Sequence, residues 1–365
     1  MATARATRHL PPGAPSLRAA VARLFMAGIP GPALDDETRR LYAGTPFGGV
    51  VLFRHNAAAP ATMRTLTRAL HALDPALPPL VAIDHEGGRV HRLGPPFTHF
   101  PPAATVAAHG VGAVRAVATA TARELAAIDV DLTFAPVLDV ASNPANPVIG
   151  DRAFGPVPST VTTLALAAFR ATRASGLLAC GKHFPGHGDT ATDSHLELPV
   201  IAKSRRALGA LELVPFRRAI AARIPMLMTA HVLYRTVDPA VPATLSRPIL
   251  TGLLRRTLGF RGVICSDDLE MRAIADRWTP ADAAVASLAA GADLLLFCHR
   301  QDALRAAVDA VEHAVIEGRL PARRIAEAYR RVVALARWRA RRRRILPLSV
   351  IGCRAHARLD AALRG

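Results

Sequence analysis

The 365-residue sequence is poor in cysteine, in aromatic residues and in acidic side chains. Its four cysteines lie far apart with no paired C-x-x-C motif, which favours buried, reduced thiols over disulfides or a zinc cluster. No apolar run reaches the roughly 18 to 20 residues that span a bilayer. The first residues also lack an apolar segment followed by a small-residue cleavage site. We therefore expect a cytoplasmic protein without stable membrane insertion.

Acidic residues are outnumbered, with 28 Asp and Glu against 46 Lys and Arg and a net charge of +18. Six arginines fall within "RWRARRRR" at 337–344. This charge suits an anionic polymer, and a non-enzymatic protein that binds such a polymer is one alternative function. Aromatic residues make up only 5% of the chain, however, and no aromatic-interleaved basic surface or DNA-reading motif accompanies the charge. We expect solvated arginines, a basic helix end and no nucleic-acid partner.

Eight short apolar runs recur along the chain, and most are followed by an amphipathic stretch rich in Ala, Leu and Arg. Continuous apolar runs of this length are typical of strands that are covered on both faces. No strand leads into a G-x-G-x-x-G turn, which disfavours an open doubly wound sheet. Strand followed by helix, eight times, predicts a (β/α)8 barrel. The runs are 24–28, 48–53, 79–84, 131–140, 176–183, 225–231, 262–268 and 292–299.

The predicted barrel is a single domain over residues 20–338, preceded by an N-terminal extension at 1–19. Residues 339–365 form a basic C-terminal extension, which we expect to pack loosely on the barrel. We expect the protein to be a monomer. The helices are predicted from apolar residues at three- and four-residue spacing, and examples are 60–73, 113–128, 160–175 and 207–223.

Ionisable residues collect where the predicted strands end. In a (β/α)8 barrel the chemistry lies at the carboxyl ends of the strands, so this placement is the strongest indication of a site that the residues themselves provide. The strand-end residues are Asp84 and His85, Asp139, Lys182 and His183, His231, and Asp267 and Asp268.

"SDDLE" at 266–270 places two adjacent carboxylates after the apolar "GVIC". Successive side chains of an extended backbone point to opposite faces, so only one of Asp267 and Asp268 faces the centre of the site. We predict a catalytic role for one of them. The alternative is that they cap the next helix or pair with the plentiful arginines.

"AIDHEGGRVHRL" at 82–93 combines the carboxylates Asp84 and Glu86 with Arg89 and Arg92 around a Gly-Gly turn. Carboxylates and guanidinium groups at a strand end can grip sugar hydroxyls through paired hydrogen bonds. A loop held together by salt bridges is the alternative interpretation, and spacing alone does not separate the two.

"KHFPGHGDTATDSH" at 182–195 is open to three interpretations. An Asp beside a His fixes the imidazole tautomer and raises its basicity, so Asp193 and His195 are candidates for a proton shuttle. A metal-dependent barrel hydrolase is the second, and its ligands are His183, His187, Asp189 and His195. The first strand carries no ligand and H-E-x-x-H is absent, which disfavours a metal. A phosphate loop lacks its G-K-[ST] signature.

Seven motifs, in order, carry a resemblance to a known family. The sequence resembles the glycoside hydrolase family 3 β-N-acetylglucosaminidases of bacterial cell-wall recycling, from about residue 20 to residue 335. This resemblance implies a β-N-acetylhexosaminidase that hydrolyses a terminal β-linked N-acetylglucosamine with retention and without a cofactor. It implies a carbohydrate substrate, N-acetylglucosamine joined to 1,6-anhydro-N-acetylmuramic acid. The motifs are "GGVVLF", "AIDHEGGRVHRL", "FAPVLDV", "NPVIGDRAFG", "KHFPGHGDTATDSH", "MTAH" and "GVICSDDLEM".

The resemblance also implies roles for single residues. Asp267, the first aspartate of "SDD", is implied as the nucleophile. His195 of "DSH" is implied as the general acid and base, oriented by Asp193. The implied contacts to the sugar are Asp84, Arg92, Arg152, Lys182 and His183.

The chain departs from the family pattern at three positions, none of which removes a catalytic group. His85 stands where glutamine is usual, Cys265 where an aliphatic residue is usual, and Glu270 where a small residue is usual. We also expect the glycine-containing loop that carries His195 to swing, so that the imidazole reaches the glycosidic oxygen only when substrate is bound.

Overall fold

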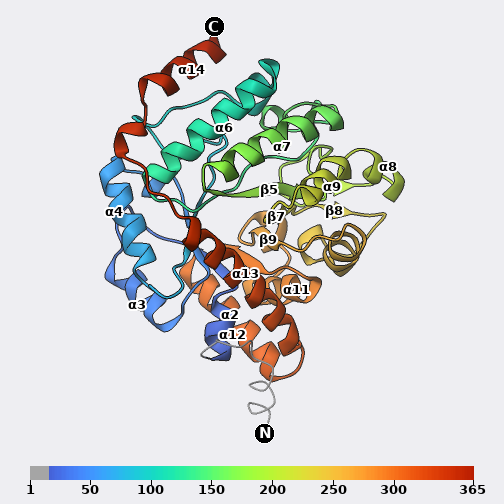
Figure 1. The fold of residues 1–365 in the computed structure, drawn as a ribbon. Coiled ribbons are helices and arrows are strands. Elements are labelled where there is room, and N and C mark those ends of the chain that lie inside the picture. Colours follow the sequence, from blue (N-terminus) through green and yellow to red (C-terminus); the bar gives the residue numbers. More distant parts are fainter. Residues whose placement is uncertain (1–15) are drawn as a thin grey trace.

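A computed structural model describes residues 16–365 of the protein (Figure 1). Eight parallel strands close into a barrel with neighbours in chain order, and helices surround it. The (β/α)8 barrel predicted from the sequence is therefore confirmed. The barrel strands are β1 (Phe25–Gly28), β2 (Gly49–Leu52), β3 (Leu80–Ile83), β4 (Leu132–Thr133), β5 (Leu178–Phe184), β7 (Met226–Thr229), β9 (Val263–Asp268) and β10 (Leu294–Phe297).

Each barrel strand lies within or overlaps one of the eight apolar runs. Side chains fill the barrel interior and helices cover its outside, so β2, β3, β7 and β10 are buried at every position. Strand β5 is the longest, and all seven of its residues are buried, including Lys182 and His183. These two polar side chains therefore belong to the carboxyl end of a barrel strand rather than to a surface loop.

One predicted helix is wrong as a single element. Residues 207–223 form two helices because the backbone at Leu211 leaves the helical region, and this break buries the Glu212 carboxylate 2.6 Å from Lys203 Nζ. The helices are α2 (Leu17–Ala22), α3 (Asp36–Gly44), α4 (Pro60–His71), α5 (Ala103–Ala108), α6 (Gly110–Ala127), α7 (Pro158–Ala174), α8 (Arg205–Ala210), α9 (Leu213–Ala221), α10 (Arg272–Ala275), α11 (Pro280–Ala290), α12 (Gln301–Ile316), α13 (Ala322–Arg342) and α14 (Arg354–Arg364).

Several smaller elements complete the described chain. A two-stranded parallel sheet joins two loops beyond the barrel, and a π-helical segment lies between β8 and β9. None of the described helices is long and apolar enough to cross a bilayer. The elements are the strands β6 (Val200–Ile201) and β8 (Leu233–Tyr234), the π-helix η4 (Pro248–Thr257) and the 3₁₀ turns η1 (Arg54–Asn56), η2 (Gly150–Arg152), η3 (Ala243–Leu245) and η5 (Leu348–Val350).

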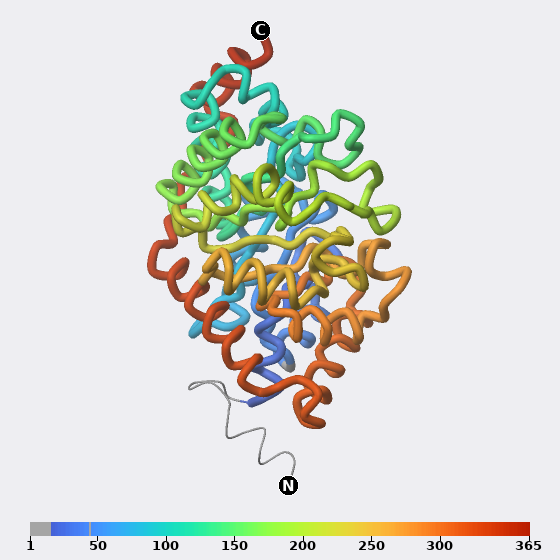
Figure 2. The backbone as a smooth tube through the Cα atoms, turned by 90° about the vertical axis from the view of Figure 1, so that its right-hand side faces the viewer, coloured from blue at the N-terminus to red at the C-terminus, as the bar shows by residue number. Residues whose placement is uncertain are grey.

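The C-terminal segment, red in Figures 1 and 2, runs along one side of the barrel as α13 and ends as α14 against α6. Helix α13 is continuous to Arg342, so the boundary expected after residue 338 falls inside this helix. The segment beyond it is fixed by buried apolar side chains, Ile351 and Leu363. The loose packing that we expected for this extension is therefore wrong.

Buried carboxylates hold the basic end of α13 against the barrel. Arg339 is 1% exposed, and its Nε lies 3.0 Å from Asp131 Oδ1. Arg343 forms an ion pair with Asp129, whose carboxylate is fully buried. Two arginines of the "RWRARRRR" run are thus structural, because each neutralises a carboxylate that the barrel has removed from water.

Replacing Arg343 tests this anchor. We expect Arg343→Gln to lower the free energy of unfolding by about 2–4 kcal/mol, because Asp129 then stays buried beside a neutral partner. Urea denaturation followed by circular dichroism measures the change. Arg344→Gln is the control, since Arg344 is exposed, and it should cost less than about 0.5 kcal/mol. Equal stability of the two variants would contradict a structural role for Arg343.

Candidate active site

Charged residues from different strands meet at the carboxyl-terminal rim of the barrel. Lys182 on β5 reaches Asp84, which follows β3, with 2.6 Å between Nζ and Oδ1. His231, which follows β7, lies with Nε2 2.9 Å from the backbone oxygen of Asp268 on β9. Barrel closure thus brings together residues that are far apart in the sequence.

Glu86 is the centre of a buried charge network at this rim. Arg152 of η2 donates two hydrogen bonds to its carboxylate, at 2.8 and 2.9 Å, and Lys182 Nζ lies 2.6 Å from Oε1. Burial by itself raises the pKa of Glu86, but the positive charges of Arg152 and Lys182 outweigh burial and leave the pKa well below its ordinary value. Glu86 is therefore ionised, and it holds both cations in fixed positions.

Asp84 shares Lys182 with Glu86 and is more open to solvent. Burial lowers the pKa of Lys182, yet the two carboxylates outweigh it and the net shift is upward, so the ammonium group stays charged. Arg92 lies on the other side of Asp84, with 3.5 Å between Nη2 and Oδ2. The rim thus presents ionised donors and acceptors side by side, an arrangement that suits polar hydroxyl groups.

Asp139 orients the imidazole ring of His183. Its carboxylate is fully buried and lies 2.6 Å from His183 Nδ1. It also accepts hydrogen bonds from the backbone nitrogens of His183 and His187, at 3.1 and 2.7 Å. Burial raises the pKa of Asp139, but the charge of His183 and these hydrogen bonds outweigh it, and the pKa lies below its ordinary value. One carboxylate therefore fixes the His183 ring and the start of the following loop.

The adjacent aspartates at the end of β9 differ in their ionisation. Burial raises the pKa of Asp267, but the charges of His231 and His183 outweigh it, so the pKa is lowered overall. Burial and the neighbouring charge of Glu270 raise the pKa of Asp268 to about 7. Asp267 is therefore the carboxylate that is ionised near neutral pH, as a nucleophile must be.

His195 and Asp193 lie on the loop that follows β5. Nδ1 of His195 lies 2.7 Å from Asp193 Oδ1, and the same oxygen accepts the His195 backbone N–H at 2.8 Å. The His195 side chain is 61% exposed. The Asp193 contact directs Nδ1 inward and leaves Nε2 free for proton transfer.

The same loop is anchored at its base. A Cβ on Gly188 would lie 1.6 Å from the Val140 backbone oxygen, so only glycine allows the chain to pass there. The His187 ring is buried between Thr190 Oγ1 and Ser194 Oγ, each 2.9 Å away. His187 therefore braces the loop.

The four candidate metal ligands are engaged separately. His183 contacts Asp139 and His195 contacts Asp193, while Asp189 Oδ1 lies 2.9 Å from Lys203 Nζ. Within residues 16–365, no three His, Cys, Asp or Glu side chains form a group that could hold a metal ion. The structure thus offers no support for the metal-dependent alternative.

Three residues of the site were not among the predicted site residues, namely Glu86, Asp139 and His231. The sequence offers Glu86 either as a sugar-gripping carboxylate or as part of a salt-bridged loop, and it offers the other two only as strand-end residues. Their position after a barrel strand was the available signal. Their importance depends on partners from other strands, which spacing along one strand does not reveal.

Two of the three departures from the family pattern have a clear setting. Glu270 accepts the backbone N–H groups of His299 and Arg300, at 2.6 and 2.9 Å, and so holds the chain that follows β10. His85 is buried, and its ring packs in a tilted arrangement against that of His91, with 4.1 Å between the ring centroids. Cys265 is fully buried in β9, and nothing in its contacts explains the preference for a thiol.

The sequence model of the glycosyl hydrolase family 3 N-terminal domain matches residues 16–335. The chain belongs to glycosyl hydrolase family 3. It is 41% identical over 335 residues to a β-hexosaminidase of Alkalilimnicola ehrlichii, an alignment that covers 88% of this chain and 95% of the relative. As predicted, the protein is a glycoside hydrolase.

Two solved structures of family 3 resemble the fold closely. A β-N-acetylglucosaminidase from a Paenibacillus species superposes with a TM-score of 0.91 at 39% identity, covering 95% of this chain and 68% of that one. NagZ from Neisseria gonorrhoeae, solved with N-trifluoroacetyl-D-glucosamine, superposes with a TM-score of 0.73 at 33% identity. That alignment covers 86% of this chain and 98% of NagZ.

A substitution at Asp139 tests its role in this family 3 site. Asp139→Asn keeps the shape of the side chain but removes the charge that faces His183. We expect kcat/KM for a nitrophenyl glycoside to fall about ten- to a hundredfold, since a hydrogen bond to a charged group contributes about 1.5–3 kcal/mol. The control is Asp189→Asn on the same loop, which should stay within about threefold of the parent, since Asp189 makes only partly exposed contacts. Unchanged kinetics of Asp139→Asn would show that the contact is dispensable.

Proposed function

We propose that the protein is a retaining exo-β-N-acetylglucosaminidase, which removes a terminal, non-reducing β-linked N-acetylglucosamine. The observation that carries this proposal is the ionised, partly buried Asp267 at the end of β9, whose pKa lies below its ordinary value because His231 and His183 are close to it. An ionised carboxylate that is reachable from solvent, on the same rim as a histidine–aspartate pair, suits nucleophilic attack with proton transfer to the leaving group. The names of the β-hexosaminidase and β-N-acetylglucosaminidase relatives support the same sugar class.

Five residues are proposed to bind the sugar before the cleaved bond. The network around Glu86 supports this proposal because it holds charged donors and acceptors rigid before substrate arrives, which lowers the entropic cost of binding. His183 is held by Asp139 in the same way. The proposed sugar contacts are Asp84, Arg92, Arg152, Lys182 and His183.

In the first chemical step, Asp267 attacks the anomeric carbon while the bond to the leaving oxygen breaks. His195 donates the proton on Nε2 to that oxygen, and the departing group leaves as an alcohol. The Asp193 carboxylate, 2.7 Å from Nδ1, stabilises the imidazolium that exists before the transfer and holds the ring in position. The product is a glycosyl ester on Asp267.

In the second step the roles reverse. Neutral His195 takes a proton from water through Nε2, and the resulting oxygen nucleophile attacks the anomeric carbon. The ester bond breaks, Asp267 leaves as a carboxylate, and the sugar is released with its original β configuration. A histidine as the acid–base group brings no second anion close to Asp267, so it does not raise the pKa of the nucleophile as a carboxylate would.

The proposed physiological substrate is N-acetylglucosamine joined to 1,6-anhydro-N-acetylmuramic acid, in peptidoglycan recycling in the cytoplasm. The net charge of +18 is compatible with this proposal, because a basic protein does not repel a substrate that carries carboxylates. The enzyme is proposed to act as a monomer.

The two adjacent aspartates provide a matched test. We expect Asp267→Asn to lower kcat at least about a thousandfold, because the amide cannot form the glycosyl ester. Release of nitrophenol from nitrophenyl β-N-acetylglucosaminide measures the activity. Mass spectrometry of the anhydro-disaccharide before and after incubation measures cleavage of the proposed substrate.

Asp268→Asn is the control for that comparison. Its carboxyl already has a pKa of about 7, so neutralising it should change kcat less than about tenfold. Addition of a chelator should leave the parent enzyme unaffected. Full activity of the Asp267→Asn variant would show that Asp267 is not the nucleophile. If the parent enzyme hydrolysed the nitrophenyl glycoside but left the anhydro-disaccharide intact, the proposed muropeptide substrate would be excluded.

The loop carrying His195 is proposed to swing toward bound sugar. The large exposed fraction of the His195 side chain supports this, whereas Ser194 is held by His187 and by the backbone N–H of Ala273, at 2.9 and 3.3 Å. A swing must break or stretch these two contacts. Crystal structures with and without N-acetylglucosamine test it, with His195 Nε2 expected within about 3.2 Å of the glycosidic oxygen position only in the complex. A rigid loop in both crystals would rule the swing out.

A further inference from the structure

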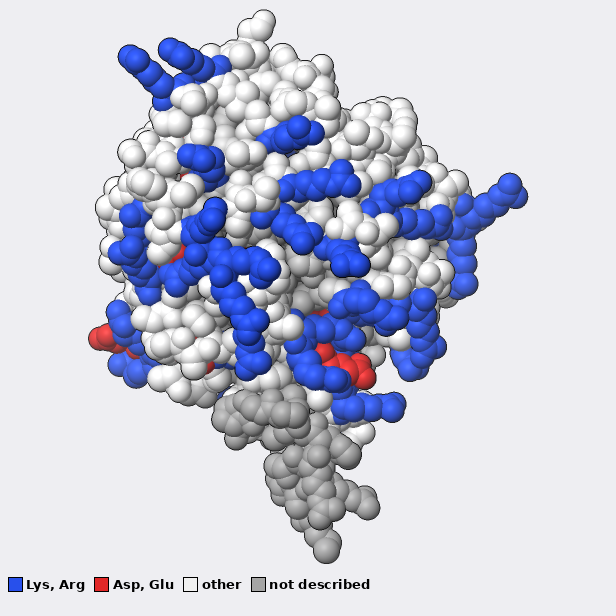
Figure 3. Space-filling model, in the orientation of Figure 1, with Lys and Arg blue, Asp and Glu red and all other residues white. Residues whose placement is uncertain are grey.

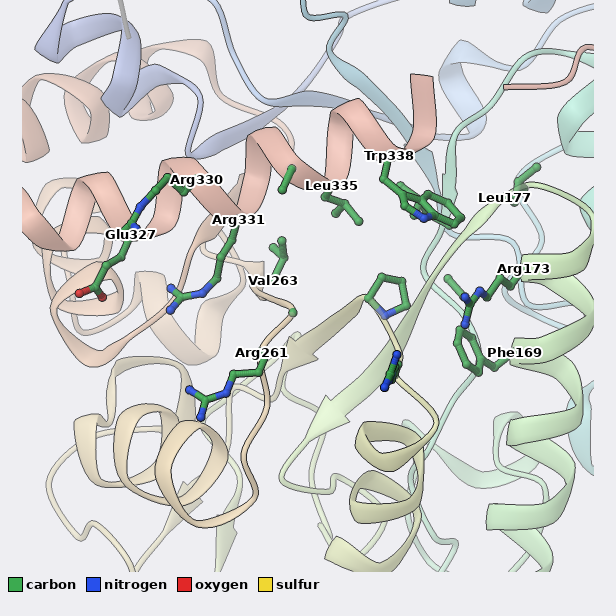
Figure 4. A pocket seen from close by; sticks show the side chains of 16 residues that line it. Phe169, Arg173, Leu177, Arg261, Val263, Glu327, Arg330, Arg331, Leu335 and Trp338 are labelled. Atoms are coloured by element: carbon green, nitrogen blue, oxygen red, sulfur yellow. The ribbon is translucent and has the colours of Figure 1, made fainter. Parts of the chain in front are cut away.

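A cavity of about 480 Å³ opens at the amino-terminal end of the barrel, between α13 and α7 (Figure 4). Its volume lies within the roughly 300–1,000 Å³ of small-molecule sites. Figure 4 shows side chains from both helices and from the start of β9 lining it. This cavity, which we call the basal cavity, belongs to no part of the proposed catalytic site.

The basal cavity and the proposed catalytic site lie at opposite ends of the same strands. Leu178 lines the cavity and Lys182 stands four residues later on β5, while Val263 and Asp267 have the same relation on β9. At about 3.3 Å per residue, the two ends of each pair are about 13 Å apart, and the packed barrel interior lies between them. A ligand in the basal cavity therefore does not touch the catalytic residues.

The charges around the basal cavity are mostly positive. Five arginines and one glutamate line it, namely Arg173, Arg223, Arg261, Arg330, Arg331 and Glu327. Among the charged side chains on the face over which α13 and α7 run, Lys and Arg predominate and few are acidic (Figure 3). The local field therefore favours an anion.

Four of the five arginines are exposed, and one of these, Arg330, donates its Nε to the backbone oxygen of Ala326 at 3.2 Å. The other three are available to a ligand. Within residues 16–365, Arg173, Arg223 and Arg261 form no ion pair, and all three are exposed. In contrast, Arg331 lies 3.0 Å from the buried carboxylate of Asp293, which also binds two further arginines. Three guanidinium groups around one carboxylate leave an excess of positive charge beneath the cavity.

The floor of the basal cavity is apolar. Phe169, Leu177, Val263 and Leu335 are buried and contribute to it. Trp338 extends from α13 into the cavity in Figure 4, and its ring has Arg342 at 4.7 Å from the centroid. An apolar floor beneath a rim of guanidinium groups suits a molecule with a planar or apolar part and an anionic part.

We propose that the basal cavity binds a small organic phosphate, with its phosphate groups on Arg173, Arg223 and Arg261 and its ring or apolar part against Trp338. Guanidinium groups bind phosphate oxygens in pairs, and the five arginines outnumber the single carboxylate, Glu327, around the cavity. A bare inorganic anion leaves the apolar floor uncovered. This proposal does not depend on the proposed glycosidase function.

Titration calorimetry with ADP as the probe tests the proposal. We expect binding to the full-length protein, weakened at least about tenfold in Arg173→Gln/Arg261→Gln and in Trp338→Leu. Arg323→Gln is the matched control, since Arg323 is an exposed arginine of α13 that does not line the cavity, and its affinity should equal that of the parent. Hydrolysis of the nitrophenyl glycoside, expected unchanged in all variants, reports that they are folded.

Three further probes separate the sources of the interaction. Inorganic pyrophosphate should bind at least about tenfold more weakly than ADP, because it does not cover the floor. Adenosine should also bind more weakly, because it carries no charge for the arginines. Vesicles containing phosphatidylglycerol test a lipid headgroup as the source. No ADP binding at millimolar concentration, equal affinity in the double variant, or binding of the vesicles alone would each overturn the proposal.

Discussion

Lys182 keeps its positive charge inside the barrel because two carboxylates lie 2.6 Å from its ammonium group. A cation removed from water is stable only with such partners. Glu86 also binds Arg152, so one buried carboxylate orients side chains from β5 and η2. The proposed sugar site therefore depends on charges that are matched before any substrate binds. Asp267 lies in the field of the histidines at this rim, and that field keeps it ionised.

The other end of the barrel uses the same principle for a different purpose. Buried Asp129, Asp131 and Asp293 each hold arginines that belong to α13 or to the segment after it. These ion pairs attach the C-terminal helix to the barrel, which accounts for part of the arginine excess. Arg173, Arg223 and Arg261 have no such partner among residues 16–365, and they line the basal cavity. Some of the arginines that give the protein its positive net charge thus stabilise the fold, and others lie on the surface.

Much of the fold is readable from the chain alone because the signals are local. Apolar runs of strand length predict every barrel strand, and β5 is recognisable although it contains Lys182 and His183 near its end. The single helix predicted for 207–223 is wrong because the backbone leaves the helical region at Leu211, and at this break Glu212 pairs with Lys203, which lies outside both helices. The boundary predicted after residue 338 lies inside α13. Arg339 and Arg343 look solvated in the sequence, but they pair with the buried carboxylates of Asp131 and Asp129, about 200 residues earlier in the chain.

The sequence by itself determined the barrel, the family and the motifs that end its strands, since these depend on patterns within a few dozen residues. Only the tertiary structure decided how those motifs work together. It made Glu86 and Asp139 the supports of the proposed sugar-binding residues, and it separated the ionisation of Asp267 from that of Asp268. The physical reason is that burial and the charge of neighbours across the rim set these properties, and both exist only after the barrel has closed.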